Sequence, residues 1–470
     1  MVSSLPDELL RYILAHAISL ESDHTMVKPP SERLHPLFPG RTHPSGADNH
    51  YVLRWTMWRR STMVVHNFVQ VNRLWWYIAE QFLYSTFYFG KEEWRVQKFI
   101  DTIKSKPDLA GQLRTLGIMP CIHNHCAEEG RFRTLFEQVL SLCHGIAAIM
   151  VHSHLLEGSL PLLQSPESEL RLLLLSALNQ HGEEFPTFMR NFNRYANLQV
   201  LELSSSMDLS HLQLFGAGAE PSFPECITFP SLHTLLLGDL DWITLLVVAK
   251  WELPSLRELG LYMPPDASEE LYPIIRQSYQ RLEFLDVAVN ALHHSGFHSI
   301  TQAPPHLKNV TLQMTGTCSS APTHPATNPF FNHVVTLGIC WFAMIKREDQ
   351  PQWVEFFSDS TYMPHLRSVL TDMTLDSYCE YLGHPSSPVI ELLRSLEEVL
   401  SNRGVAFKGV MGDCSSFFLM GRHFFNQTPS RSACPCFVID RCSSPYQHPS
   451  EGHRWSIKFC IMYISDVNVL

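Results

Sequence analysis

Residues 256–261 read Leu-Arg-Glu-Leu-Gly-Leu, and this short pattern decides the fold that we expect for most of the chain. Leu259 and Leu261 are separated by one residue, so in a strand both side chains lie on the same face. Leu256 stands three residues earlier and anchors the turn into that strand. The pattern therefore predicts a short strand with one apolar face and an apolar residue at its entrance.

The same apolar-x-x-apolar-x-apolar pattern recurs along the chain at intervals of 24 to 34 residues. Its copies begin at Leu113, Ile146, Leu170, Leu198, Leu232, Leu256, Leu282, Leu307 and Val334, with a degenerate copy at Leu366. The interval brackets or slightly exceeds that of leucine-rich repeats, which runs from about 20 to 29 residues. Leu282–Asn290 carries Asn at the ladder position and most copies do not. The copies therefore resemble irregular leucine-rich repeats.

Segments with helical spacing of apolar residues lie between the copies. These segments are Glu92–Lys104, Phe132–Cys143, Trp242–Trp251, Glu269–Tyr279, Trp353–Phe357 and Val389–Leu400. Strands of one signature that alternate with helices predict an α/β solenoid of stacked parallel strands with outer helices. Tyr84–Phe89 is expected to form a strand at its start. Gly404 suits a helix C-cap, and Val405–Val410 is expected as the closing strand.

The chain opens with a short helical pattern that carries apolar residues on two neighbouring stripes. The stripes are Leu5, Leu9 and Ile13, and Leu10, Leu14 and Ala17. Pro6 suits the first helical turn, where its missing N–H is not needed. One stripe can pack inside its own domain, and the other is then available to a partner.

Together with Phe68–Tyr84, this opening resembles an F-box. The second segment matches the family's pattern at Val71, Arg73, Trp75, Ile78, Ala79, Leu83 and Tyr84. Asn72 stands where Cys is common and Trp76 where a basic residue is common; the resemblance implies that Trp75 packs inside and that Trp76 is more exposed. A polar insertion at about 21–60 separates the two halves, as is frequent in fungal F-box proteins.

The resemblance implies three parts of the chain: an F-box-like helical domain over 1–90, a leucine-rich-repeat solenoid over 91–411 and an unassigned tail over 412–470. Such a protein is a substrate-recognition subunit of an SCF-type cullin-RING ubiquitin ligase. By the family's pattern, a Skp-type adaptor, and through it a cullin, is bound by Leu5, Pro6, Leu9, Ile13 and Val71. The repeats would bind a protein target whose identity stays open.

Two other functional classes stay open beside this one. The F-box-like segment could only cap the solenoid of a non-enzymatic repeat scaffold, because terminal repeats need a cap. A hydrolase with an unrecognised site is the third hypothesis.

Target-binding candidates follow from strand alternation, which sends the residues between the inward positions to the other face of the sheet. The residues expected to be exposed there are His152, Glu202, Glu258, Tyr262, Asp286 and Gln313, beside the apolar Leu172, Leu174 and Leu236. The acidic pattern predicts either a stripe that binds a basic segment of the target or an ordinary solvated acidic surface, formed by Glu202, Glu258 and Asp286.

Charge and apolar patterning exclude several other partners. The formal net charge of -11 argues against nucleic acid, because phosphate binding needs a basic patch. Asp7 and Glu8 interrupt any apolar signal segment, and the longest apolar runs are too short to span a bilayer. We therefore expect a cytoplasmic or nuclear protein that has no membrane contact and keeps its 12 cysteines reduced.

Motifs for catalysis are absent from the sequence: it has no nucleophile elbow, phosphate loop or His-Glu-x-x-His. We expect no enzyme, no catalytic residue and no cofactor. Two groups of Cys and His were considered as zinc ligands, namely Cys121, His123, His125 and Cys126, and Cys434, Cys436 and Cys442 with His448 or His453. Neither has the ligand spacing of common zinc modules, so no metal site is expected.

Overall fold

The structure is a computed structural model that describes parts of the chain between residues 8 and 409. The described residues are 8–14, 62, 65–71, 73–89, 93–118, 129–152, 170–176, 195–204, 226–238, 240, 245, 247–262, 268–292, 304–314, 321, 329–340, 345–371 and 388–409. The chain divides into two compact units, Met1–Gly412 and Asp413–Leu470, and every described residue belongs to the first. The expected insertion at about 21–60 and the tail over 412–470 lie outside the described residues. The expected boundary near residue 90 falls within the first unit and stays a prediction.

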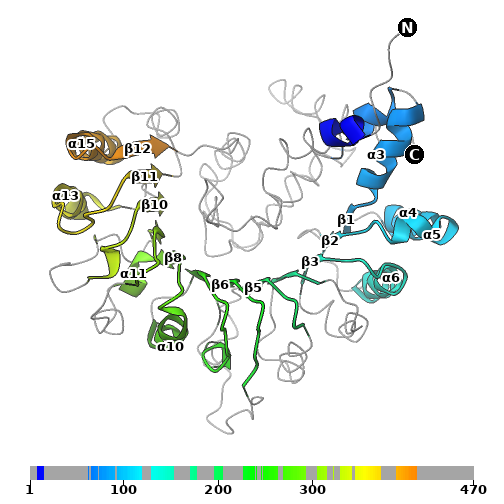
Figure 1. The fold of residues 1–470 in the computed structure, drawn as a ribbon, viewed down its shortest axis with the longest axis horizontal. Coiled ribbons are helices and arrows are strands. Elements are labelled where there is room, and N and C mark those ends of the chain that lie inside the picture. Colours follow the sequence, from blue (N-terminus) through cyan, green and yellow to red (C-terminus); the bar gives the residue numbers. More distant parts are fainter. Residues whose placement is uncertain are drawn as a thin grey trace, which may run out of the picture. The chain divides into compact units, whose positions relative to one another are not determined.

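Within the described part of the chain, twelve parallel strands form one sheet in the order of the sequence (Figure 1). The strands are β1 (Thr86–Phe89), β2 (Thr115–Ile118), β3 (Ala148–His152), β4 (Leu172–Ser176), β5 (Val200–Ser204), β6 (Thr234–Gly238), β7 (Glu258–Tyr262), β8 (Phe284–Ala288), β9 (Asn309–Gln313), β10 (Thr336–Cys340), β11 (Ser368–Thr371) and β12 (Ala406–Gly409). Each strand therefore pairs only with the strands before and after it in sequence. The α/β class and the parallel, repeat-like stacking of strands are confirmed.

Helices fill the intervals between strands and lie on one side of the sheet, as Figure 1 shows for α4, α6, α10, α13 and α15. The helices are α3 (Arg73–Leu83), α4 (Glu93–Ser105), α5 (Pro107–Ala110), α6 (Glu129–Leu142), α10 (Ser268–Ser278), α11 (Val289–Leu292), α13 (Gln350–Ser358) and α15 (Pro388–Asn402), with 3-10 helices η8 (Pro329–Phe331) and η10 (Arg347–Asp349). In the expected helix Trp242–Trp251, the described helical residues are 245, 247 and 248.

Helix α15 illustrates how local sequence sets the bounds of an element. It begins at Pro388, whose missing N–H is not needed in a first turn. After it, Gly404 adopts a φ of 70°, where glycine is tolerated far better than other residues. The Val405 N–H then bonds the Leu400 carbonyl at 2.8 Å. The expected C-cap is confirmed, and β12 follows at once.

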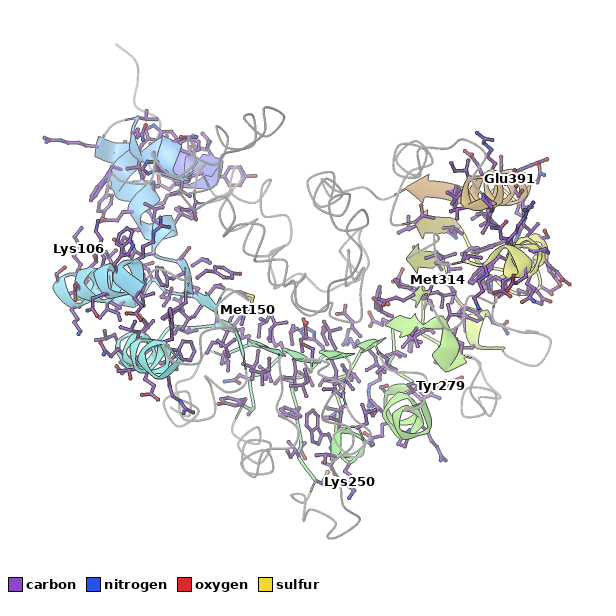
Figure 2. The ribbon with its side chains drawn as sticks, turned by 180° about the vertical axis from the view of Figure 1, so that it is seen from behind. Lys106, Met150, Lys250, Tyr279, Met314 and Glu391 are labelled. Atoms are coloured by element: carbon purple, nitrogen blue, oxygen red, sulfur yellow. The ribbon has the colours of Figure 1, made fainter. Side chains whose placement is uncertain are left out.

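The core lies between the sheet and the helices. The apolar positions of the copy at Leu256, including Leu259 and Leu261, are buried, and the same positions are buried in every copy wherever their side chains are described. Burying one such aliphatic side chain contributes roughly 1.5–3 kcal/mol, so the leucine pattern itself holds the repeats together. Figure 2 shows Lys106 and Glu391 on the helix side of the sheet and Met150 on strand β3.

A second set of hydrogen bonds joins the repeats at the edge where the strands begin. The carbonyl of Arg257, just before β7, accepts the N–H groups of Glu283 at 2.8 Å and Phe284 at 3.1 Å. The same double acceptance occurs at Ser85, Arg114, Ala147, Arg171, Gln199, His233, Glu283, Lys308 and Val335. Together with Arg257 these residues form one column along the edge of the sheet, with one residue before each of β1–β10. Arg367, whose carbonyl accepts the Ala406 N–H at 2.9 Å, extends the column to β11.

Candidate functional site

Residues 8–14 form a helix whose two apolar stripes have different surroundings. Leu10 and Leu14 are buried, with Leu10 only 3% exposed, and they pack in a cluster with Val65, Ile78 and Ala79. Leu9 and Ile13, on the other stripe, are 48% and 40% exposed. One stripe thus packs inside its own domain, as the sequence predicted.

Aromatic residues complete this helical cluster. Trp75 is partly buried and stacks on Phe68, with ring centroids 4.7 Å apart. Trp76, its neighbour on α3, is exposed on the outside. A hydrogen bond of 2.5 Å from Arg11 Nη1 to Gln81 Oε1 joins the helix at 8–14 to α3. The different packing of the two tryptophans agrees with the sequence expectation.

An exposed apolar stripe therefore remains on the opening helix; we define it as Leu9, Tyr12 and Ile13. Residues three and four apart are neighbours on a helix surface, so the three side chains form one surface. Val71, in the turn that precedes α3, is also exposed. Three of the five expected adaptor-binding residues are thus accessible, and the other two, Leu5 and Pro6, lie outside the described residues.

One ionic contact ties α3 to the start of the repeats. Lys106, beside α5, lies 2.6 Å from Glu80 Oε1 and 5.3 Å from the centre of the Trp76 ring. The hydrogen bond to Glu80 raises the pKa of Lys106, which keeps this ammonium charged. The pair joins the helical cluster to the first repeats, and the exposed apolar stripe remains uncovered, since Leu9, Tyr12 and Ile13 all stay exposed.

Four of the six expected target-binding residues lie with described side chains on the face of the sheet opposite the helices, but the expectation that these four are exposed was wrong. Glu202 is 2% exposed and Asp286 is fully buried, and Glu258 and Gln313 are buried as well. The side chains of His152 and Tyr262 lie outside the described residues. Strand alternation predicts correctly which face a side chain takes, but not what covers it there.

Lateral neighbours explain part of this burial. In the ladder, Glu202 lies between Leu174 and Leu236, and both of these side chains are buried. The hydroxyl of Thr234 donates to Glu258 Oε2 at 2.5 Å, and Gln313 Nε2 donates to Asp286 Oδ1 at 3.1 Å. Such bonds offset the loss of hydration that burial of a carboxylate entails. The three carboxylates therefore do not form the exposed acidic stripe that the sequence predicted.

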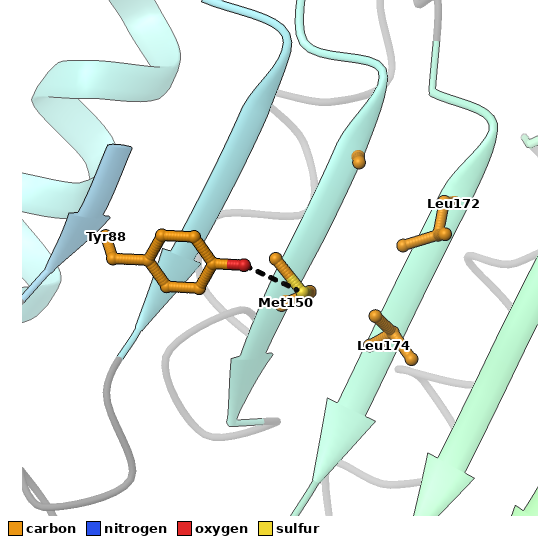
Figure 3. Close-up of a cluster of buried hydrophobic side chains, with 5 residues drawn as sticks. Tyr88, Met150, Leu172 and Leu174 are labelled. Atoms are coloured by element: carbon orange, nitrogen blue, oxygen red, sulfur yellow. Dashed lines mark hydrogen bonds between the residues drawn. The ribbon is translucent and has the colours of Figure 1, made fainter. Parts of the chain in front are cut away.

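The first strands carry an apolar cluster on this same face. It consists of Tyr88, Ala148, Met150, Leu172 and Leu174 (Figure 3). Val200 packs against this cluster. The Tyr88 side chain crosses over Gly117 on β2, and its hydroxyl donates to Met150 Sδ at 3.5 Å. This face is thus apolar over β1–β4, whereas β5 and β8 carry the buried carboxyl groups of Glu202 and Asp286.

The described residues show little that points to metal or thiol chemistry. In the described ranges, His, Cys, Asp and Glu form no group of three that could hold a metal ion. Burial raises the pKa of the Cys143 thiol to about 12, so this thiol stays protonated and unreactive at neutral pH. Both Cys/His groups considered as zinc ligands lie outside the described residues. No described helix is both apolar enough and long enough to span a bilayer.

Sequence reasoning missed a set of basic residues that the fold places at the edge where the strands begin. They are Arg257, Arg281, His306, Lys308, His333, His365 and Arg367, and all seven are exposed. Each stands directly before or after the first apolar residue of its copy. The signal was therefore present in the sequence, and it becomes visible once the copies are aligned on that residue.

A scan of protein-family models and a search of curated proteins each find no match to this chain.

Proposed function

We propose that this protein is the substrate-recognition subunit of an SCF-type cullin-RING ubiquitin ligase that acts in the cytoplasm or nucleus. Its F-box-like helices bind a Skp-type adaptor, and through it a cullin, and its leucine-rich repeats bind a protein target. In this role it performs no chemistry but raises the effective concentration of the target near the ubiquitin carrier.

The observation that carries the proposal is the contrast between the two stripes of the opening helix. Leu10 and Leu14 anchor the helix in the core of its own domain. Leu9 and Ile13 are aliphatic although they take no part in that core and are exposed. Adjacent exposed apolar side chains on a helix are typical of interaction sites. Val71 adds a further exposed apolar side chain from the turn before α3.

The repeats support the second half of the proposal. One strand per copy, an apolar residue at each strand entrance and a helix in most of the described intervals are the features expected of leucine-rich repeats. Stacked repeats of this kind offer extended surfaces for protein recognition.

A scaffold whose helical segment only caps the repeats is the alternative. A cap would cover apolar surface, and the exposure of Leu9 and Ile13 favours the adaptor instead. The decisive measurement is a titration of the full chain with a purified Skp-type adaptor. Absence of binding by the unaltered chain would overturn the ligase proposal and favour the scaffold.

A variant pair locates the binding site. Leu9→Asp with Ile13→Asp should weaken adaptor binding by more than about 2 kcal/mol, or roughly 30-fold, since it removes two central apolar anchors. Trp94→Asp, at an exposed aromatic residue on α4, is the matched control and should bind the adaptor normally. Circular dichroism checks that both variants fold. Adaptor binding by the double variant at unaltered strength would refute the assignment of the site.

A further inference from the structure

The edge of the sheet where β7–β11 begin is markedly basic in a chain whose net charge is -11. We define the basic edge as Arg257, Arg281, His306, Lys308, His333, His365 and Arg367. A cluster of positive charges attracts an acidic partner locally, even when the net charge of the whole protein is negative. The arrangement of these side chains therefore matters more than the total charge.

Three permanently charged residues of the basic edge belong to the column of strand-entrance residues. Arg257, Lys308 and Arg367 stand directly before β7, β9 and β11, and Glu283 and Val335 stand between them. Neighbouring strands lie about 4.8 Å apart, so the three cations recur about every 10 Å. Their spacing is fixed by the backbone, because the carbonyls of Arg257, Glu283, Lys308 and Val335 each accept an N–H from the next repeat.

A second column runs beside the first. Arg281, His306, His333 and His365 each precede the first apolar residue of their copies. The rings of His333 and His365 stack with centroids 6.3 Å apart and planes 5° apart, so the second column keeps the order of the strands.

Among the described residues, one carboxylate pairs with the basic edge. Glu283 pairs with Arg257, with Oε1 and Nη1 3.2 Å apart, and both side chains are largely exposed. Such a surface pair contributes at most about 1 kcal/mol and can be replaced by a ligand carboxylate. Within the described part of the chain, Lys308 and Arg367 make no ion pair.

Arg403 shows what a cation with a structural role looks like: it is partly buried, and its guanidinium donates to the carbonyls of Phe357 at 2.5 Å and Met363 at 3.1 Å. Arg281 of the basic edge also has such a role, because its Nη2 donates to the carbonyls of Leu253 and Gln277, both at 3.3 Å. The charged ends of Lys308 and Arg367 make no such bonds among the described residues, so the fold itself does not account for them.

We propose that the basic edge binds an extended acidic segment of a protein partner, with a carboxylate at about every third residue. A polyproline II segment has three residues per turn and rises about 3.1 Å per residue, so every third side chain lies on one face about 9.3 Å apart. This repeat matches the spacing of Arg257, Lys308 and Arg367. A short acidic peptide contacts only the basic edge. A long nucleic acid would extend beyond the edge and be repelled by the net negative charge of the chain.

The proposal goes beyond the adaptor and holds whether or not the opening helix binds one. The test uses the full chain and a fluorescent peptide of four Glu-Pro-Ser repeats, with anisotropy measured at low ionic strength. Binding should weaken as salt is added, because exposed charges are screened. The same peptide with Gln in place of Glu should not bind.

Two triple variants distinguish an effect of the basic edge on peptide binding from an effect of the overall charge. Arg257→Gln, Lys308→Gln and Arg367→Gln together should weaken peptide binding about tenfold, as expected for the loss of three exposed ion pairs. Lys98→Gln, Lys104→Gln and Arg394→Gln remove the same charge from exposed positions on α4 and α15 and should leave binding within about twofold.

Several results would overturn the proposal. The site is wrong if the unaltered chain does not bind the peptide, or if both triple variants lose binding equally. The spacing is wrong if a peptide of the same composition with its four Glu residues in one block binds as tightly. Tighter binding of a single-stranded oligonucleotide of equal charge would assign the edge to nucleic acid instead.

Discussion

Replacing Gly117 with alanine should destabilise the first strands of the sheet by about 1–3 kcal/mol, which is the usual penalty for overpacking a buried site. A Cβ at this position would lie 2.4 Å from Tyr88 Cε1 and 2.5 Å from Cδ1. Carbon atoms pack best at about 3.5–4.0 Å, so the ring would have to move by more than about 1 Å. Tyr88 is buried against Met150 and cannot move without opening the cluster.

Gly111→Ala provides the matched control. Gly111 has a φ of -70° and a ψ of -12°, and an added Cβ would meet only the Asp108 carbonyl oxygen, at 3.7 Å. The same change there should be neutral or stabilising by about 0.4–1 kcal/mol, because alanine restricts the unfolded chain. Urea unfolding, followed together with hydrogen exchange of peptides that cover 86–118, measures both variants.

A double-mutant cycle identifies the cause of the effect. Tyr88→Ala removes the ring that the new methyl group would meet, so Gly117→Ala should lose most of its penalty in that background. If the full penalty persists without the ring, the backbone of β2 rather than the Tyr88 contact is responsible, and the packing argument fails.

Three further predictions concern single residues. Leu10→Ala should cost about 2–5 kcal/mol of stability in urea unfolding because it empties a buried site, whereas Leu9→Ala should leave stability within about 0.5 kcal/mol. Gly404→Ala should cost about 1–2 kcal/mol, since a side chain is strained at its positive φ; an unchanged unfolding midpoint would contradict this. Burial holds the pKa of Cys143 at about 12, above its ordinary value of 9.0, so alkylation mapped by mass spectrometry at pH 8 should modify the exposed Cys226 before Cys143. The contribution of Cys143 to stability should be constant below pH 9 and fall between about pH 9 and 12, where the unfolded thiol ionises first.

The sequence predicted the strands well because their signal is local. Leu259 and Leu261 need only be two residues apart to mark one face of a strand, and the register of β7 with β6 and β8 follows from the same positions. Helix α15 and its cap were equally visible, through apolar spacing and Gly404.

The surface chemistry of the sheet was harder to predict. Whether Glu202 and Asp286 are exposed depends on residues of other repeats, about 25 to 35 positions away in the ladder. The basic edge was missed for the same reason: Lys308 and Arg367 become neighbours in a column only when separate copies are superimposed. Reading one copy at a time shows only one or two basic residues in each.

The strict order of the strands also determines how a disturbance spreads. Since each strand bonds only to its predecessor and successor, the repeats form a one-dimensional chain of couplings, and the influence of a local defect decays with the number of interfaces it must cross. A substitution at Gly117 should therefore increase amide exchange most at β1–β3 and hardly at β8. A peptide bound across Arg257 and Arg367 would, by contrast, bridge repeats that do not touch one another and suppress the independent opening of each. In such an array, a ligand along the edge would stabilise several repeats at once.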